Sequence, residues 1–187
     1  MADRMFNFVG GDVGLWQVVK IEAMIGPPLE RVARLEVVEG KLDALPESGT
    51  WLLRGVTSYE RYVTRAERNL LVARQQGLGR PEATCAALIP ISKSAAWWEL
   101  TQDERRAILE TQSEHIKTGI KYLPAVARRL HHGRELGEEF DFLTWFEYAP
   151  ADAAGFEELV SVLRKTEEWA YVEREIDIRL SRTETAA

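Results

Sequence analysis

The sequence has a single cysteine, Cys85, among its 187 residues. One cysteine excludes an internal disulfide and a cluster of cysteine metal ligands. No apolar run approaches the roughly 20 residues that cross a membrane. The opening stretch, residues 1–11, also lacks the apolar core of a secretory signal. We therefore expect a cytoplasmic protein with no membrane partner.

Positive charge is also scarce. Lys and Arg total 24 against 30 Asp and Glu, which gives a formal net charge of -6. This balance does not indicate the basic surface that phosphate contacts need, so it argues against a nucleic-acid partner. Hydrophobic residues make up 45% and charged residues 29% of the chain, as in ordinary globular proteins. We treat residues 1–187 as one domain.

Familiar catalytic patterns are missing as well. The sequence contains no His-Glu-x-x-His, no Gly-x-Ser-x-Gly, no phosphate loop and no Cys-x-x-Cys. Two of the three histidines, His131 and His132, lie just before Gly133, and we interpret them as exposed loop residues rather than zinc ligands. The remaining histidine, His115, therefore carries most of the chemical interest.

Apolar, β-branched and aromatic residues alternate with polar ones in several stretches, which is typical of strands. The predicted strands are 14–24, a hairpin-like piece at 35–40, 50–57, 83–91 with Pro90 near its end, 140–148 and 169–180. In the stretch 140–148 we expect one side to carry Phe140, Phe142, Thr144, Phe146 and Tyr148.

Three helices are predicted between these strands. The first begins at a capping-box pattern in 57–60 and runs to about Gln76, and the second begins at the clearer capping box 101–104 and ends at Pro124. The third begins near Pro150. One face of the second helix holds Ile108, Thr111, His115, Gly119 and Tyr122, and one face of the third holds Phe156, Leu159, Val160 and Leu163.

This alternation of strands and helices predicts an α+β fold built from two ferredoxin-like βαβ units. A doubly wound parallel sheet gives a similar order, but Gly77-Leu-Gly79 follows a helix and not a strand, so the phosphate-binding fingerprint is absent. The long, alternating last two strands favour an antiparallel sheet. We expect helices on one of its faces and a partner against the other.

His115 lies on an apolar helix face one turn before Gly119, and a histidine beside a missing side chain suggests a flat ligand. A lone histidine on such a face is more often a core residue. The chain also has six tryptophans, among them the pair at 97–98. Aromatic residues usually pack in cores, but an aromatic shell with one axial histidine is also how proteins hold haem.

Three segments carry a family resemblance: 115–130, 134–148 and 166–175. They resemble the short, dimeric branch of the chlorite dismutases, and the resemblance extends over 13–182. It implies a haem b enzyme that converts chlorite to chloride and molecular oxygen, with a role in detoxification. It also implies a homodimer of ferredoxin-like, dimeric α+β barrel subunits with an antiparallel sheet and flanking helices, the N-terminal part of the repeat being shortened.

The resemblance also implies roles for single residues. His115 matches the proximal iron ligand of the family and Arg128 its distal arginine. Glu168 matches the acid that accepts the second imidazole N–H, with Glu167 as the alternative. The other implied site residues are Gln75, which would hold the distal arginine, Lys93 as a haem propionate partner, and Trp97 and Tyr62 as haem contacts.

The implied mechanism begins when ferric haem binds chlorite. Oxygen transfer gives a ferryl species and hypochlorite, which recombine to chloride and oxygen. Arg128 suits this task because a guanidinium stays protonated and holds an anion without giving up a proton. Two alternatives remain. One is a coproheme decarboxylase, a haem-biosynthesis enzyme of similar fold whose group generally lacks an arginine at the position of Arg128, and the other is a haem-binding or sensing module without turnover, which would share His115 but need no Arg128.

Overall fold

The computed structural model describes residues 4–57, 64–66, 69, 73 and 77–182. Strands in these residues form a closed barrel in the order β1-β3-β2-β8-β5-β7-β6-β4, and all neighbouring strands are antiparallel. Their bounds are β1 Arg4–Gly11, β2 Trp16–Ile25, β3 Arg34–Glu39, β4 Gly49–Thr57, β5 Cys85–Lys93, β6 Ala127–His132, β7 Phe142–Tyr148 and β8 Val172–Ser181.

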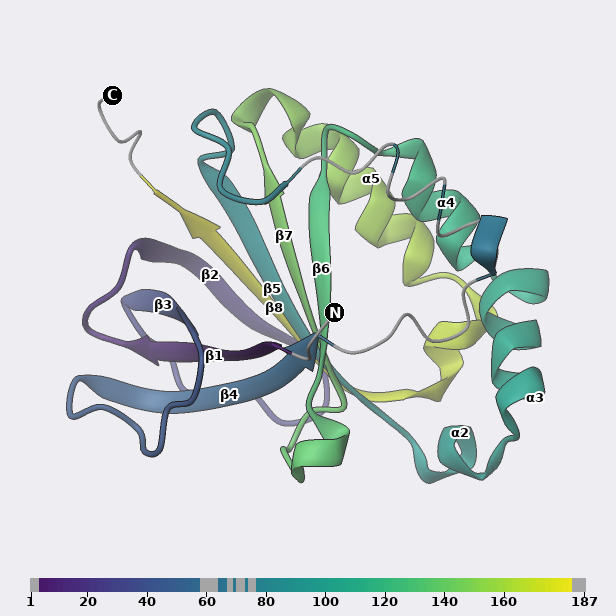
Figure 1. Cartoon of the computed structure of the whole chain (residues 1–187), viewed down its shortest axis with the longest axis horizontal. Coiled ribbons are helices and arrows are strands. Elements are labelled where there is room, and N and C mark those ends of the chain that lie inside the picture. Colours follow the sequence, from purple (N-terminus) through teal and green to yellow (C-terminus); the bar gives the residue numbers. More distant parts are fainter. Residues whose placement is uncertain (1–3, 58–63, 67–68, 70–72, 74–76, 183–187) are drawn as a thin grey trace.

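The helices lie together on one side of the barrel, where α4 and α5 run alongside β5, β6 and β7 (Figure 1). The helices are α2 Ala95–Glu99, α3 Gln102–Arg106, the π-helical turn η1 Ala107–Gln112, α4 His115–Lys121 and α5 Ala153–Leu163. Short 3-10 helices are η2 Arg134–Leu136, η3 Pro150–Asp152 and η4 Glu167–Tyr171. Among the described residues, none of these helices has the length and apolarity that crossing a membrane requires.

Alternation along β7 separates two apolar cores. Leu143 and Trp145 point into the barrel, while Phe146 and Tyr148 point outward beneath α5. The inner face thus packs against other strands of the same chain. The prediction that a partner protein covers this second face of the sheet is wrong. The outer core is completed by the predicted stripe of α5, whose buried residues are Phe156, Leu159, Val160 and Leu163. Antiparallel strands with flanking helices are confirmed, whereas the ferredoxin-like description stays a prediction.

Strand β6 corrects the interpretation of the two neighbouring histidines. It pairs with β7 along its whole length, so His131 and His132 lie in a sheet and are only 1% and 5% exposed. His131 points into the barrel between Phe6 and Phe8, and its Nδ1 is 3.0 Å from the carbonyl oxygen of Leu143. Burial lowers the pKa of His131 to about 4, so this histidine is neutral at physiological pH.

Two further details of the strands differ from expectation. Pro90 lies inside β5 and not at its end, because β5 pairs with β8 at Leu88 and again at Ile91 but at neither residue between them. A proline lacks a backbone N–H and is tolerated where the ladder is interrupted. Phe140 precedes β7 and belongs to the barrel interior, so it does not share a side with Phe146 and Tyr148 as predicted.

The second predicted helix is broken. Its capping box is confirmed, since the backbone N–H and the hydroxyl of Thr101 both donate to Glu104 Oε2 at 2.7 Å. After η1, however, Glu114 adopts a left-handed backbone with φ of 46°, and α4 begins afresh at His115. A π-helical turn inserts an extra residue into the helical repeat, so a 3.6-residue periodicity does not reveal the break.

The barrel interior is expected to dominate stability. Ile178 is fully buried there, and Ile178→Ala should lower the free energy of unfolding by about 2–5 kcal/mol through lost apolar contacts and a residual cavity. Denaturant unfolding measures this loss. Val19→Ala is the control because Val19 is 65% exposed on the same barrel, and its effect should stay within about 0.5 kcal/mol. Equal losses in the two variants would contradict the assignment of the core.

Candidate functional site

His115 is the first residue of α4, immediately after the helix break. Its side chain is 26% exposed, and its Nδ1 lies 2.7 Å from Glu168 Oε2. The backbone N–H of Ile116 donates to the Glu110 carboxylate at 2.8 Å, which satisfies one of the free donors at the start of α4. The break therefore places His115 at a helix start, where its ring meets the 3-10 helix η4.

Glu168 lies on η4 with its side chain only 5% exposed. Lys93, on β5, places its ammonium 2.8 Å from Glu168 Oε1 and 3.2 Å from the Glu168 carbonyl oxygen. The ammonium also lies 4.6 Å from the ring of Trp97 and 5.6 Å from that of Trp169. These contacts form what we call the Lys93–Glu168–His115 network, a buried row of cation, anion and imidazole.

The network controls the charge of its central carboxylate. Burial by itself raises the pKa of Glu168, but the charges and hydrogen bonds of His115 and Lys93 outweigh it and lower the pKa to about 2. Burial lowers the pKa of Lys93, and Glu168 and Asp141 oppose that shift. Because an ionised carboxylate can only accept a hydrogen bond, the proton of a neutral His115 lies on Nδ1, and Nε2 keeps its lone pair.

Arg128 projects from β6 toward the same helix. Since His131 points into the barrel, strand alternation turns Arg128 and Leu130 to the outer face, on the side of the helices. The Arg128 guanidinium occupies the space that a side chain on Gly119 would need. Burial lowers its pKa, and the charge of Glu110 opposes that shift. Gly119 thus accommodates Arg128, and its missing side chain does not by itself indicate a flat ligand.

The structure brings several of the candidate residues together. His115, Glu168 and Lys93 are in direct contact, whereas Glu167 is exposed. Lys93 has only 1% of its side chain exposed, and its ammonium contacts Glu168. Trp97 packs beside that ammonium and is 1% exposed. The remaining candidates, Gln75 and Tyr62, lie outside the described residues.

Two contacts of the network were not anticipated from the sequence. Ser113 Oγ accepts the backbone N–H of Glu168 at 3.1 Å, and Asp141 Oδ2 accepts the backbone N–H of Lys93 at 2.7 Å. Each joins residues about fifty positions apart. Neither a serine before a histidine nor an aspartate before a strand is a signal that sequence reasoning could have used.

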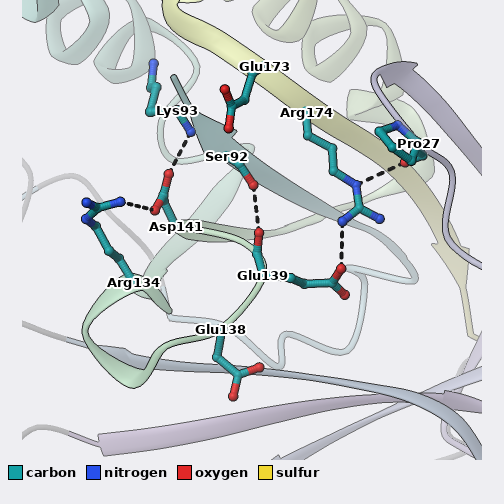
Figure 2. Close-up of a pocket in the computed structure, with 9 residues that line it drawn as sticks. All are labelled: Pro27, Ser92, Lys93, Arg134, Glu138, Glu139, Asp141, Glu173 and Arg174. Atoms are coloured by element: carbon teal, nitrogen blue, oxygen red, sulfur yellow. Dashed lines mark hydrogen bonds and ion pairs between the residues drawn. The ribbon is translucent and has the colours of Figure 1, made fainter. Parts of the chain in front are cut away.

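A separate pocket of about 530 Å³ lies beside β5 and β8 (Figure 2). Its carboxylates are mostly paired with arginines: Glu139 with Arg174 at 2.6 Å, and Asp141 with Arg134 at 3.3 Å. Neither His115 nor Arg128 lines it, and Lys93 turns its ammonium toward Glu168. The candidate site therefore lies elsewhere, between α4, η4 and the outer face of the sheet.

The chain is similar to solved structures of chlorite dismutases. The fold is that of a crystal structure of a dimeric chlorite dismutase from Nitrobacter winogradskyi, which is 58% identical, with a TM-score of 0.87, over 95% of this chain and 99% of that chain. A chlorite dismutase mutant from Candidatus Nitrospira defluvii, 20% identical over 95% of this chain and 90% of that chain, shares the fold with a TM-score of 0.63.

Sequence relatives point the same way. Residues 42–183 match the family model described as chlorite dismutase. The chlorite dismutase of Ideonella dechloratans is 36% identical over 86 residues, which are 46% of this chain and 28% of that relative. The chain belongs to the chlorite dismutase family.

The pKa of Glu168 predicts how acid acts on the protein. Because folding lowers this pKa from 4.5 to about 2, the ionised network stabilises the fold above about pH 4.5, and this contribution is lost as the pH falls toward 2. Glu168→Gln should therefore cost more stability at pH 6 than at pH 3 in denaturant unfolding. Glu167→Gln, at an exposed position outside the network, should change the stability by no more than about 0.5 kcal/mol. A cost of Glu168→Gln that is the same at both pH values would contradict the network.

The packing of Arg128 on Gly119 predicts a coupling between these two positions. In an Arg128→Ala background, Gly119→Ala should stabilise the fold by about 1 kcal/mol, because alanine favours a helix interior. With Arg128 present, the gain should be smaller, since the new methyl group overlaps the guanidinium. Unfolding free energies of the four proteins measure this difference. Equal gains in both backgrounds would show that the two residues do not touch.

Proposed function

We propose that this protein is a haem b enzyme that converts chlorite to chloride and molecular oxygen. In this proposal His115 ligates the iron through Nε2, and Arg128 binds the chlorite anion. The observation that carries it is the 2.7 Å contact between His115 Nδ1 and a buried, ionised Glu168, which leaves Nε2 as the ligating atom. Membership of the chlorite dismutase family supports the choice of substrate.

Residues of the network and of β6 fit a haem. Trp97 Nε1 is buried and has no hydrogen-bond partner in the described part of the chain, so an acceptor from a ligand such as a haem carboxylate suits it. Leu130 is 44% exposed on the face of β6 that carries Arg128, and it offers an apolar surface to a flat ring. The His115 nitrogen suits the iron, the unpaired N–H of Trp97 suits a haem carboxylate, and the apolar surface of Leu130 suits the flat ring.

Within the site, Glu168 would orient the imidazole and make it a stronger donor to the metal, as carboxylates beside metal-bound histidines do. Lys93 keeps that carboxylate ionised, which is a different role from the propionate contact expected from the sequence. Bound haem would supply the redox centre at which the chlorite Cl–O bonds are broken and the O–O bond is formed.

Arg128 would hold the substrate. A guanidinium is charged at any working pH, so it attracts chlorite and retains a chlorine-containing anion without transferring a proton to it. Gln75 is proposed to hold Arg128 in place and Tyr62 to contact the haem, both by family resemblance.

Two structural details belong to the same proposal. The relative from Nitrobacter winogradskyi is described as dimeric, and we propose a homodimer for this chain. The element order of 85–181, strand, helices, two strands, helix, strand, supports a ferredoxin-like repeat in this half of the barrel.

The direct test gives chlorite to the purified, haem-loaded protein in front of an oxygen electrode. Arg128→Ala should keep its Soret band while kcat falls by about 10²-fold, the usual loss when one donor to a developing anion is removed. Arg129→Ala is the matched control because Arg129 turns the other way, over the ring of Phe6, and should keep its turnover. His115→Ala should weaken haem binding.

Other outcomes would reject the proposal. Haem binding without oxygen release would favour a non-catalytic haem module, and decarboxylation of coproheme by the wild-type protein would favour the haem-biosynthesis alternative. An unchanged Soret spectrum in His115→Ala would reject His115 as the ligand.

A further inference from the structure

Glu168 contacts the segment that carries His115 at two points. Its carboxylate meets His115 Nδ1, and its backbone N–H donates to Ser113 Oγ at 3.1 Å. We propose that Ser113 is a positioning residue that fixes the geometry of the His115–Glu168 pair. The inference rests on the proposed function, in which His115 is the haem ligand.

The Glu168 side of this contact is rigid. Lys93 donates to the Glu168 carbonyl oxygen at 3.2 Å, and the backbone N–H of Ser94 donates to Tyr171 at 2.8 Å, which ties η4 to the end of β5. Trp169 Nε1 donates to Glu175 Oε2 at 2.8 Å, which ties η4 to β8. The backbone of Glu168 therefore has a fixed place on the sheet.

On the His115 side the helix is interrupted, and α4 is tied back to η1 by the bond from Ile116 N–H to the Glu110 carboxylate. The chain passes through a π-helical turn, closed by a bond from Ser113 N–H to the Ile108 carbonyl, and then through the left-handed Glu114. A continuous helix would set the direction of α4, but a break of this kind does not. The bond between Ser113 Oγ and the Glu168 N–H spans 55 positions and joins the end of η1, two residues before His115, directly to the 3-10 helix η4.

Burial makes the contact hard to replace. Ser113 is only 7% exposed and Glu168 only 4%, so removal of the hydroxyl would leave the Glu168 N–H without a partner and out of reach of bulk water. The backbone around Glu168 would then shift toward another acceptor. Its carboxylate, one side chain away, would lose alignment with His115 Nδ1.

The consequence concerns the imidazole. The hydrogen bond at Nδ1 decides which nitrogen of a metal-binding histidine carries the proton and how basic the other one is, and the loss of such outer contacts typically weakens metal binding 10–100-fold. Ser113 acts one contact further out, so Ser113→Ala should weaken haem binding by about tenfold, at the low end of that range.

The experiment compares Ser113→Ala with Ser113→Thr, which keeps a hydroxyl, and with Glu168→Gln as the reference for a lost partner. In the haem-free protein, imidazole ¹⁵N chemical shifts report the fraction of His115 with its proton on Nδ1. In the ferrous haem-loaded protein, resonance Raman spectroscopy reports the iron–histidine stretching frequency, and haem transfer to apomyoglobin reports affinity.

Ser92→Ala is the control. Ser92 is also buried; its hydroxyl donates to the backbone carbonyl of Glu139 at 2.9 Å, and Ser92 lines the separate pocket (Figure 2). Both alanine variants should lower the melting temperature, but only Ser113→Ala should move the two spectroscopic signals. If Ser113→Ala does not fold, Ser113→Cys takes its place, since a thiol is a similar-sized but weaker acceptor.

The proposal is supported if Ser113→Ala shifts the Nδ1–H fraction and the iron–histidine frequency toward those of Glu168→Gln while Ser113→Thr stays near wild type. It is overturned if Ser113→Ala matches wild type in both signals, or if Ser92→Ala moves them equally. Failure of the proposed function looks different: His115→Ala would then bind haem normally, while the imidazole shifts of the haem-free protein still decide the role of Ser113.

Discussion

The structure around the candidate site depends on one buried carboxylate, that of Glu168. A carboxylate out of water is costly unless cations and hydrogen-bond donors surround it. Lys93 supplies the cation at 2.8 Å, and His115 supplies a second partner at 2.7 Å. Because these residues come from β5, η4 and α4, satisfying a single charge holds a strand, a 3-10 helix and the start of a helix together.

The closed barrel makes this arrangement possible. Since the inner faces of the strands pack on one another, the outer face of β5, β6 and β7 is free to carry helices and a site (Figure 1). Strand alternation then assigns neighbouring residues to different tasks. Arg128 turns toward α4, with Leu130 on the same face of the strand, whereas Arg129 and His131 turn toward the phenyl rings of β1. The register of β6 on β7 thus determines which side chains of β6 face the site.

Strands with strong alternation, helices with a clear apolar stripe and a clear capping box were predictable, as β8, α5 and Thr101 show. Strand β6 was not, because its sequence, Ala-Arg-Arg-Leu-His-His, has too few apolar residues to display a period of two. Strand β1 also went unassigned. The break before α4 was not predicted, because one extra residue in a π-helical turn leaves the spacing of apolar residues almost unchanged.

By itself, the sequence determined which side chains are available: one histidine on a helix, an arginine beyond it and a glutamate near the last strand, in segments that resemble one family. Tertiary structure alone decided that Lys93 is buried against Glu168, that Gly119 makes room for Arg128, and that Ser113 holds the Glu168 backbone. The reason is physical. Lys93 and Ser113 stand 75 and 55 positions from Glu168, and only the folding of the sheet and its helices brings them within hydrogen-bonding distance.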